Sequence, residues 1–308
     1  MSQKKMVCDV ETGLCGEADG EEMEAVQFNQ PKKEIDIYYV TDPICSHCWA
    51  LEPVLRRFQL QFGSYFKFHT VMGGLLEKWS DTPVDPANGI SGPADVVAHW
   101  KEVGQHSRMP IDGSLMADDY VTSSYPSSRV FKVIQKEYND KLAYTFLRHA
   151  REALFAFNQN ISDSKILVEL IEGLGLDGEK IVQQADSALG HQLLEEDFNL
   201  KDNLGVRGFP TIIMVNQEGQ GIKIVGARAF DDYVRGLQQV LPEDRLQPKQ
   251  TPAFADLLKQ ENLLFSKEVE VLYDLEHSQV GSFAEKELEA EDYQIHNLLG
   301  ENYYTLKK

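Results

Sequence analysis

The sequence predicts an α/β protein that carries a long all-helical insertion and ends in a small, mostly helical module. Three observations predict this class. Strand, helix and strand patterns follow one another over residues 34–71, which is typical of a βαβ unit with parallel strands. Only helical patterns follow over residues 93–203. A hairpin and a helix then complete the α/β part, before two prolines at 242 and 248 mark a linker.

The βαβ unit is predicted from the spacing of its apolar residues. Residues 34–40 alternate apolar and polar positions and then become wholly apolar, which predicts a strand. Residues 49–62 have helical spacing, and residues 65–71 alternate again like a second strand. Gly73 and Gly74 end that strand.

The insertion and the closing hairpin complete the framework. The expected helices of the insertion cover residues 93–105, 114–121, 126–138, 139–157, 162–174, 177–185 and 189–203. Residues 211–215 and 222–225 are the expected strands of the hairpin, and residues 230–241 are the expected closing helix.

The C-terminal residues predict a separate winged-helix-like module. Helices are expected at 253–260, 266–275 and 282–289, followed by a strand that ends at Leu306. The predicted parts of the chain are therefore an acidic tail (1–33), an α/β domain in two pieces (34–92 and 204–247), the helical insertion (93–203) and the module (248–308).

The charge of the chain excludes several classes of partner. Forty-nine acidic residues against 30 basic ones give a formal net charge of −19, and the span from Ala253 to Lys308 alone has 12 acids and 5 bases. Nucleic acids and anionic membranes need a basic footprint, so neither is an expected partner. No signal-peptide pattern and no transmembrane-length apolar run is found, which predicts a cytoplasmic protein.

The four cysteines form two pairs, and the second pair has the context of a redox site. Cys45 and Cys48 enclose Ser46 and His47 directly after a predicted strand and at the start of a predicted helix. The free amides and dipole of a helix N-terminus stabilise a thiolate, so the pKa of Cys45 should fall below the free value of ~8.5. Cys45 is then the expected attacking thiol, Cys48 the resolving thiol, and His47 a nearby positive charge.

Zinc binding is the alternative for the same cysteines. Cys8 and Cys15 in the acidic tail could complete a four-thiolate site with Cys45 and Cys48. Their six-residue separation is long for a zinc knuckle, and the strand–CxxC–helix context favours redox chemistry. We therefore expect no metal. No phosphate loop or dinucleotide fingerprint is present, and no cofactor is implied.

A second motif precedes the hairpin. Gly208-Phe209-Pro210-Thr211 places a proline just before a strand, which is a candidate position for a cis peptide bond. A proline-flanked backbone there can pair with an extended partner, so Pro210 and Phe209 are expected at the substrate. Trp49 directly follows Cys48 and is expected to pack at the helix start or to shield the site on the substrate side.

Together these motifs resemble the DsbA family of thioredoxin-fold proteins, and within it the cytosolic FrnE-like branch. The resemblance rests on residues 42–49, on Met72-Gly73-Gly74 and on residues 206–211, and it covers about residues 34–245. It implies a thioredoxin fold interrupted by a helical insertion, with Cys45 as nucleophile, Cys48 as resolving cysteine and Pro210 as the cis proline facing them. Ser46 stands where the best-known members have proline, which leaves the redox potential open.

A weaker resemblance concerns the whole layout. An acidic C-terminal module after a DsbA-like body looks like the adaptors that deliver the transcription regulator Spx to the ClpXP protease. Two hypotheses follow: a thiol–disulfide oxidoreductase acting on protein or small-molecule thiols, and a redox-sensitive adaptor that binds a client protein through its C-terminal module. For the tail, the resemblance to FrnE-like proteins suggests that Cys8 and Cys15 exchange with Cys45 and Cys48. Incidental thiols or a loose metal site are the alternatives.

Overall fold

The computed structural model describes residues 6–9, 14–17, 35–80, 84–85, 89–241 and 246–307. The chain divides into two compact units, Met1–Pro31 and Lys32–Lys308. The first unit contains an antiparallel pair that the sequence patterns did not predict, β1 (Met6–Asp9) and β2 (Leu14–Glu17), whose backbones place Cys8 opposite Cys15. The side chains of this pair lie outside the described residues.

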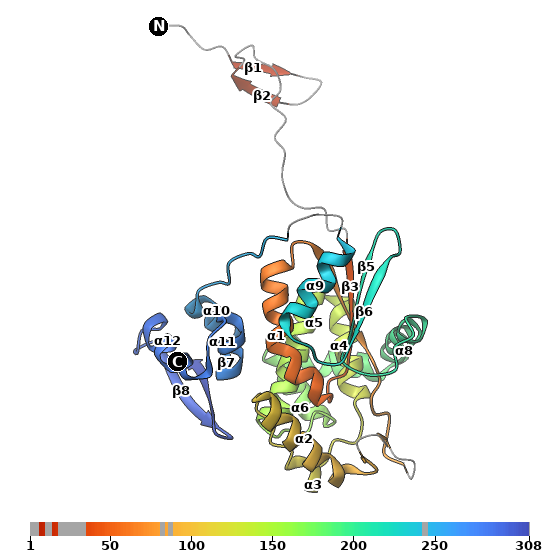
Figure 1. Cartoon of the computed structure of the whole chain (residues 1–308). Helices are drawn as coiled ribbons and strands as arrows, with labels where there is room; N and C mark the ends of the chain where they lie inside the picture. The colour runs from red at the N-terminus through yellow and green to blue at the C-terminus, as the bar shows by residue number, and fades with distance from the viewer. Residues whose placement is uncertain are drawn as a thin grey trace. The chain divides into compact units, whose positions relative to one another are not determined.

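The second unit is built around a four-stranded sheet with the order β4-β3-β5-β6 (Figure 1). Its strands are β3 (Ile35–Thr41), β4 (Phe66–Met72), β5 (Thr211–Asn216) and β6 (Gly221–Val225). β3 and β4 are parallel, whereas β5 is antiparallel to both β3 and β6. The central strand β3 therefore has one neighbour from before the insertion and one from after it.

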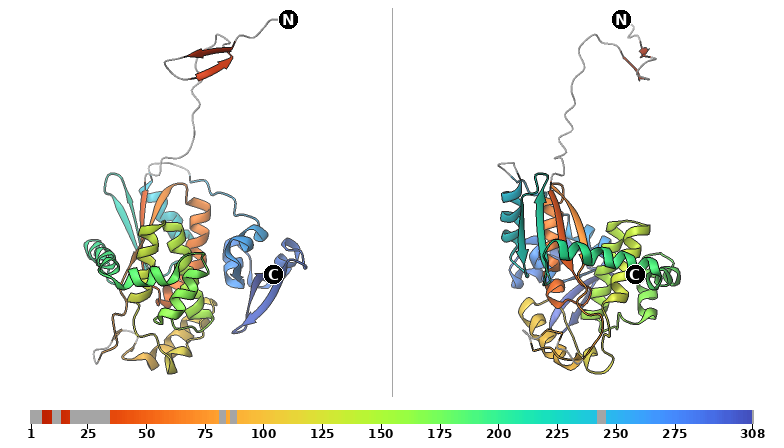
Figure 2. Two further views of the ribbon diagram at one scale, coloured as in Figure 1. Left: turned by 180° about the vertical axis from the view of Figure 1, so that it is seen from behind. Right: turned by 90° about the vertical axis from the view of Figure 1, so that its right-hand side faces the viewer.

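Helices cover both faces of this sheet. The β3 residues Ile35, Ile37 and Tyr39 pack in one apolar cluster with residues of α1 (Ser46–Phe62) and α9 (Phe230–Val240). On the other face, Val40 packs with Val206 and with strand neighbours. The right-hand view of Figure 2 shows α9 on one side of the sheet and the insertion helices on the other. Burial on both faces explains why the run in β3 becomes wholly apolar.

The insertion is all helical, as predicted. Its elements are α2 (Pro93–Ser107), α3 (Leu115–Asp118), α4 (Tyr125–Glu137), α5 (Asp140–Arg151), a π-helical turn η2 (Glu152–Ala156), α6 (Ser164–Glu172), α7 (Gly178–Asp186) and α8 (Ala188–Asn203). Side chains of Asn139, Asp163, Asp177 and Ser187 accept first-turn N–H groups and begin four of these helices. The single helix expected over 139–157 instead ends in the π-helical turn.

The C-terminal part has the element order of a winged helix. It contains α10 (Phe254–Glu261), β7 (Leu263–Phe265), α11 (Ser266–Tyr273), a 3₁₀ turn η3 (His277–Gln279), α12 (Val280–Glu287), β8 (Tyr293–Leu298) and β9 (Glu301–Leu306). The strands form a sheet in the order β7-β9-β8. The three predicted helices are present, and the expected strand is one arm of a hairpin. Over the described part of the chain, no helix has the length and apolar character needed to cross a bilayer.

Candidate thiol–disulfide site

Cys45 and Cys48 are joined by a disulfide at the first turn of α1, with their Cα atoms 5.2 Å apart. Cys45 is the N-cap residue, and its sulfur accepts a hydrogen bond from the Cys48 N–H at 3.2 Å. Cys45 is 5% exposed and Cys48 is fully buried. An attacking thiolate therefore reaches Cys45 first, while the helix N-terminus favours negative charge on that same sulfur.

Asp42 holds the loop that leads into the two cysteines. This fully buried carboxylate accepts the N–H of Ile44 at 3.0 Å and that of Leu75 at 2.7 Å, together with the Ser124 hydroxyl at 2.9 Å. Burial raises the pKa of Asp42, and these three donors oppose that rise. Both carboxylate oxygens of Asp42 accept hydrogen bonds, so Asp42 connects the loop segments that contain Ile44, Leu75 and Ser124.

The loop before β5 approaches the site from the sheet side. The Phe209–Pro210 peptide bond is cis, and Pro210 is buried. The Phe209 ring lies against Gly73, where a Cβ atom would come within 2.2 Å of the ring. This contact explains the glycine at position 73, because any side chain there would displace Phe209.

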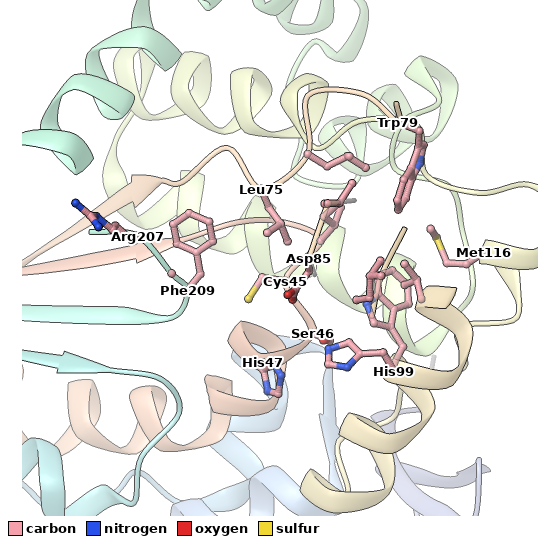
Figure 3. A pocket seen from close by; sticks show the side chains of 17 residues that line it. Cys45, Ser46, His47, Leu75, Trp79, Asp85, His99, Met116, Arg207 and Phe209 are labelled. Atoms are coloured by element: carbon pink, nitrogen blue, oxygen red, sulfur yellow. The ribbon is translucent and has the colours of Figure 1, made fainter. Parts of the chain in front are cut away.

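A cavity of 440 Å³ opens beside Cys45 (Figure 3). Its wall includes Cys45, Ser46, His47, Phe209 and Arg207, together with a larger group from the α/β domain and the insertion: Ile44, Leu75, Leu76, Trp79, Val84, Asp85, Ile90, Val96, His99, Trp100, Met116 and Gly208. In Figure 3, Arg207 and Phe209 lie on one side of Cys45, and Trp79 and Met116 lie on the other. Cys45 therefore lies in the cavity wall between these two groups of side chains.

His47 is exposed and meets a second imidazole from the insertion. The rings of His47 and His99 lie edge to face with their centroids 5.4 Å apart. Burial of part of the ring lowers the pKa of His47 below its ordinary 6.5, and His99 and His106 lower it further, while Asp85 opposes them. In the disulfide form the surroundings of His47 therefore favour the neutral imidazole, and a positive charge beside the Cys45 thiolate of the reduced form stays a prediction.

Trp49 is fully buried and does not line the cavity, so of its two expected roles the packing at the helix start agrees with the structure and the contact with substrate does not. Its indole N–H donates to the Pro110 carbonyl at 3.0 Å. Its ring stacks near Phe155 and meets Phe265 of the C-terminal module edge to face at 5.7 Å. Trp49 therefore supports the cysteine turn from behind and links it to the insertion and the module.

Buried charged residues surround the N-terminal half of α1. Glu52, one turn along the helix from Cys48, pairs with Arg151 at 2.9 Å and accepts the Tyr144 hydroxyl at 2.6 Å. Arg151 also donates to the Thr41 hydroxyl at 2.5 Å and to the Asp42 carbonyl at 3.1 Å. These bonds fasten α1 and the end of β3 to α5 of the insertion, so the cysteine turn is held from three directions.

The C-terminal module is fastened to the same region. Glu268 of α11 is fully buried and makes a two-pronged contact with Arg148 of α5, one bond being 2.7 Å. The Arg148 guanidinium lies 5.1 Å from the centre of the Trp49 ring. Sequence patterns did not reveal this junction, because its members are more than 100 residues apart and each fits an ordinary helix.

No three His, Cys, Asp or Glu side chains gather closely enough for a metal ion within the described ranges. The structure thus brings Cys45, His47 and Phe209 to one cavity, with Cys48 joined to Cys45 by the disulfide. Pro210 is buried and does not line this cavity. His99 is the notable residue that the sequence analysis missed. Its only sequence signal is a histidine on an otherwise ordinary helix, which does not indicate an active site.

A buried strand, a CxxC disulfide at the following helix N-terminus and a cis-proline loop whose Phe209 lines the same cavity as Cys45 define a thioredoxin-fold protein with a thiol–disulfide site. A family profile described as Thioredoxin matches residues 38–235. Two solved structures share the fold. The cytosolic disulfide reductase DsbM from Pseudomonas aeruginosa has a TM-score of 0.50 and 21% identity, over 62% of this chain and 89% of that one. A probable DsbA oxidoreductase from Streptomyces coelicolor has a TM-score of 0.52 and 17% identity, over 67% and 89%.

Sequence similarity to one group of proteins extends over nearly the whole chain. The chain is 30% identical over 286 residues to ClpXP adapter protein SpxH from Halalkalibacterium halodurans, covering 91% of this chain and 89% of the relative. It is 29% identical over 284 residues to the SpxH of Shouchella clausii. The chain therefore belongs to the thioredoxin family and, within it, to the family of these SpxH proteins. A match of this length has to include much of the C-terminal module.

Proposed function

We propose that this protein exchanges disulfides with protein partners through Cys45 and Cys48. The observation that carries this proposal is the disulfide at the N-cap of α1, in which Cys45 faces a cavity and Cys48 is buried. Such a site is typical of thiol–disulfide oxidoreductases, because only one of its two sulfurs meets the partner.

The reaction needs no further reagent than the partner. In the reduced protein, the Cys45 thiolate attacks one sulfur of a partner disulfide, forming a mixed disulfide and releasing the other partner sulfur as a thiolate. The Cys48 thiolate then attacks Cys45, closes the Cys45–Cys48 bond and releases the partner's first sulfur. The reverse sequence oxidises a partner dithiol. Phe209 and Pro210 would present backbone beside the partner, as in the FrnE-like branch of the DsbA family, and the cytoplasm is the proposed compartment.

A trapping experiment tests this function. In a reduced Cys48→Ser variant, the Cys45 thiolate should attack a disulfide of a model protein, and the mixed disulfide should accumulate because no second thiol releases it. Cys45→Ser should abolish both trapping and insulin reduction, while the wild-type protein turns over. Equal, near-zero insulin reduction in the wild type and Cys45→Ser would overturn the proposal. Equilibration with glutathione then gives the redox potential and with it the direction of the reaction.

The second candidate function is that of an adaptor that brings a client protein to the ClpXP protease. The observation in its favour is 30% identity to an SpxH protein over nearly the whole chain. The test is degradation of a candidate client by ClpXP with and without this protein. Faster degradation with the wild type and equally fast degradation with Cys45→Ser would favour an adaptor that does not use its disulfide.

We also propose, as a separate prediction, that the tail cysteines Cys8 and Cys15 exchange disulfides with Cys45 and Cys48. Changing Cys8 and Cys15 to serine should slow turnover with a protein substrate if the tail pair exchanges with Cys45 and Cys48. Unchanged turnover and an unchanged redox potential would contradict this exchange.

A further inference from the structure

The cavity beside Cys45 has a polar mouth and an apolar chamber. Ser46, His47 and His99 lie at the mouth near the reactive sulfur (Figure 3). The chamber extends away from them into the insertion. Its wall consists of a loop, α2 and α3, which supply Leu76, Trp79, Ile90, Val96, Trp100 and Met116. Leu76, Trp79 and Ile90 come from the α/β domain loop that follows β4, and the other three come from the insertion. This loop and the insertion, rather than the strands of the sheet, therefore decide what fits beside Cys45.

Two N–H groups of this wall are already in use, and among the described residues the one carboxylate that lines the cavity is that of Asp85. The Trp79 indole N–H donates to the Val121 carbonyl at 2.8 Å, and the Leu76 N–H donates to the Ser124 hydroxyl at 3.3 Å. The Trp100 ring is fixed edge-on against Phe155 with centroids 4.8 Å apart. The chamber therefore offers ring faces, aliphatic carbons and the Met116 thioether, a surface that gains from apolar contact and adapts to several shapes.

The position of Cys45 in the cavity wall determines which part of a partner can enter the chamber. A partner whose sulfur meets Cys45 at the mouth has its neighbouring groups directed either toward Phe209 or into the chamber (Figure 3). We propose that the chamber holds a large apolar side chain, aromatic or long aliphatic, that lies next to the reacting cysteine of a protein partner. This inference rests on the proposed disulfide exchange and adds to it a class of partner.

Size and polarity favour this occupant over a small polar thiol. A volume of 440 Å³ falls within the usual range for binding pockets and accepts one large side chain with room to adjust. A small hydrophilic thiol would leave the chamber wall in contact with water. Burying a Phe or Leu side chain there should favour the partner about 10-fold to 100-fold over the same partner with Ala.

The reaction to be measured is a single balanced step. A peptide thiolate attacks the Sγ atom of Cys45 in the oxidised protein, and the Cys45–Cys48 bond breaks. The electron pair of that bond leaves as the Cys48 thiolate, and a Cys45–peptide disulfide forms. Single-cysteine peptides that differ only in having Phe or Ala before or after the cysteine are the probes. Their rates with a small aromatic disulfide correct for differences in intrinsic thiol reactivity.

The expected result is that one Phe peptide reacts about 10-fold or more faster than its Ala counterpart. Leu75 lines the cavity and is 37% exposed, so Leu75→Glu should fold normally and should reduce this preference to less than about twofold by placing a charge at the chamber. Leu75→Met keeps the apolar wall and should keep the preference. Leu299→Glu, the same change at a leucine that is 55% exposed and lies outside this cavity, is the matched control.

A second measurement separates this inference from the proposed function. Peptides with serine in place of cysteine cannot react, but their binding should change the fluorescence of Trp79 and Trp100. If Phe and Ala peptides react at equal rates and the serine peptides show no binding preference, the proposed occupant of the chamber is wrong, while the proposal of disulfide exchange stands. A Phe preference among serine peptides, without reaction of any cysteine peptide, would support the chamber and overturn disulfide exchange. Neither reaction nor preference would overturn both.

Discussion

At the scale of residues, His47 shows how the surroundings of a side chain decide its role. The position directly before Cys48 suggested a cation that stabilises the Cys45 thiolate. In the folded protein, partial burial and the neighbouring His99 favour the neutral imidazole instead. The lowered pKa describes the disulfide form, and a cation beside the Cys45 thiolate stays a prediction for the reduced form.

Substitution of His99 tests this account. In the disulfide form, we expect the His47 ring to titrate below 6.5 and the His99→Gln variant to raise the midpoint. The rise should remain incomplete, because burial is the larger cause and persists in the variant. The C2 proton resonance of His47 measures both midpoints. His191→Gln, at an exposed histidine on α8, is the control, and an unshifted midpoint in His99→Gln would contradict the interaction.

A second residue, Asp42, carries a structural prediction. Asp42→Ala would leave the buried N–H groups of Ile44 and Leu75 without their acceptor, which should lower the free energy of unfolding by about 2–4 kcal/mol. Asp42→Asn keeps one acceptor oxygen and should lose less. Urea unfolding measures both variants, and equal losses would show that the hydrogen bonds are not the cause.

The residues that sequence analysis could identify are those with a local signature. Cys45, Cys48 and Pro210 each sit in a short motif beside a strand or helix boundary. Asp42 and His99 act through partners from distant segments, such as the Ser124 hydroxyl. No spacing within one helix or loop reveals such a partner, which is why the sequence left two roles open for Trp49, whose partners Pro110 and Phe265 are also distant.

At the scale of elements, helix α11 is joined to helix α5 by a buried ion pair. Removing one partner of such a pair leaves the other charge buried and uncompensated, which typically costs about 3–5 kcal/mol. Glu268→Ala should therefore destabilise the protein by this order, because it leaves Arg148 without its main partner.

A double substitution separates this charge effect from lost packing. Arg148→Met combined with Glu268→Met should recover most of the stability that Glu268→Ala loses, since apolar side chains can replace a buried pair. Urea unfolding followed by the fluorescence of Trp49, which lies under Arg148, measures each variant. A double variant as unstable as the single one would mean that the loss arises elsewhere.

The π-helical turn η2 gives a prediction about pH. Burial raises the pKa of Glu152, its first residue, from 4.5 to about 7, although Arg148 at 2.7 Å opposes the rise. The folded protein then binds more protons than the unfolded chain between these pH values. The stabilisation from this carboxyl is fully present below about pH 4.5 and is lost as the pH rises through 7.

Glu152→Gln removes that dependence. Between about pH 5 and pH 7.5, the wild type should lose more unfolding free energy than the variant, by at most about 3 kcal/mol. Parallel urea titrations at the two pH values give the comparison. If both proteins change equally, Glu152 does not titrate in this range.

Most elements could be predicted because their apolar periodicity is local. The exceptions have physical reasons. β7 has three residues, which is too short to show an alternation, and β8, the arm of the hairpin that was not expected, has three exposed residues among its six. The π-helical turn follows α5 without a proline or glycine to mark the change.

At the scale of the whole molecule, the net charge of −19 should govern the speed of encounter with partners. A cationic peptide disulfide should react with the reduced protein faster than a neutral one at low ionic strength. The advantage should shrink several-fold as salt is raised to about 0.3 M, because screening shortens the range of the attraction. Stopped-flow rates at several salt concentrations measure this, and a constant ratio would show that the acidic surface does not steer the reaction.

The overall architecture could be predicted more completely than the contacts between its parts. The helical insertion and the winged-helix-like module were both expected from the sequence. The contact of Phe265 with Trp49, across more than 200 residues, depends on how the module folds back on α1, and no single segment encodes that. The cysteine turn consequently touches all three parts of the second unit.

The interrupted sheet has a consequence for how the protein is made. Strand β3 ends at Thr41, but its antiparallel neighbour β5 begins at Thr211, roughly 170 residues later. At a synthesis rate of about 5–20 residues per second, β3 leaves the ribosome roughly 10–30 s before β5 exists. Throughout that interval one edge of an apolar strand is open to pairing with another nascent chain. We therefore expect the newborn protein to depend on ribosome-associated chaperones until its second half emerges.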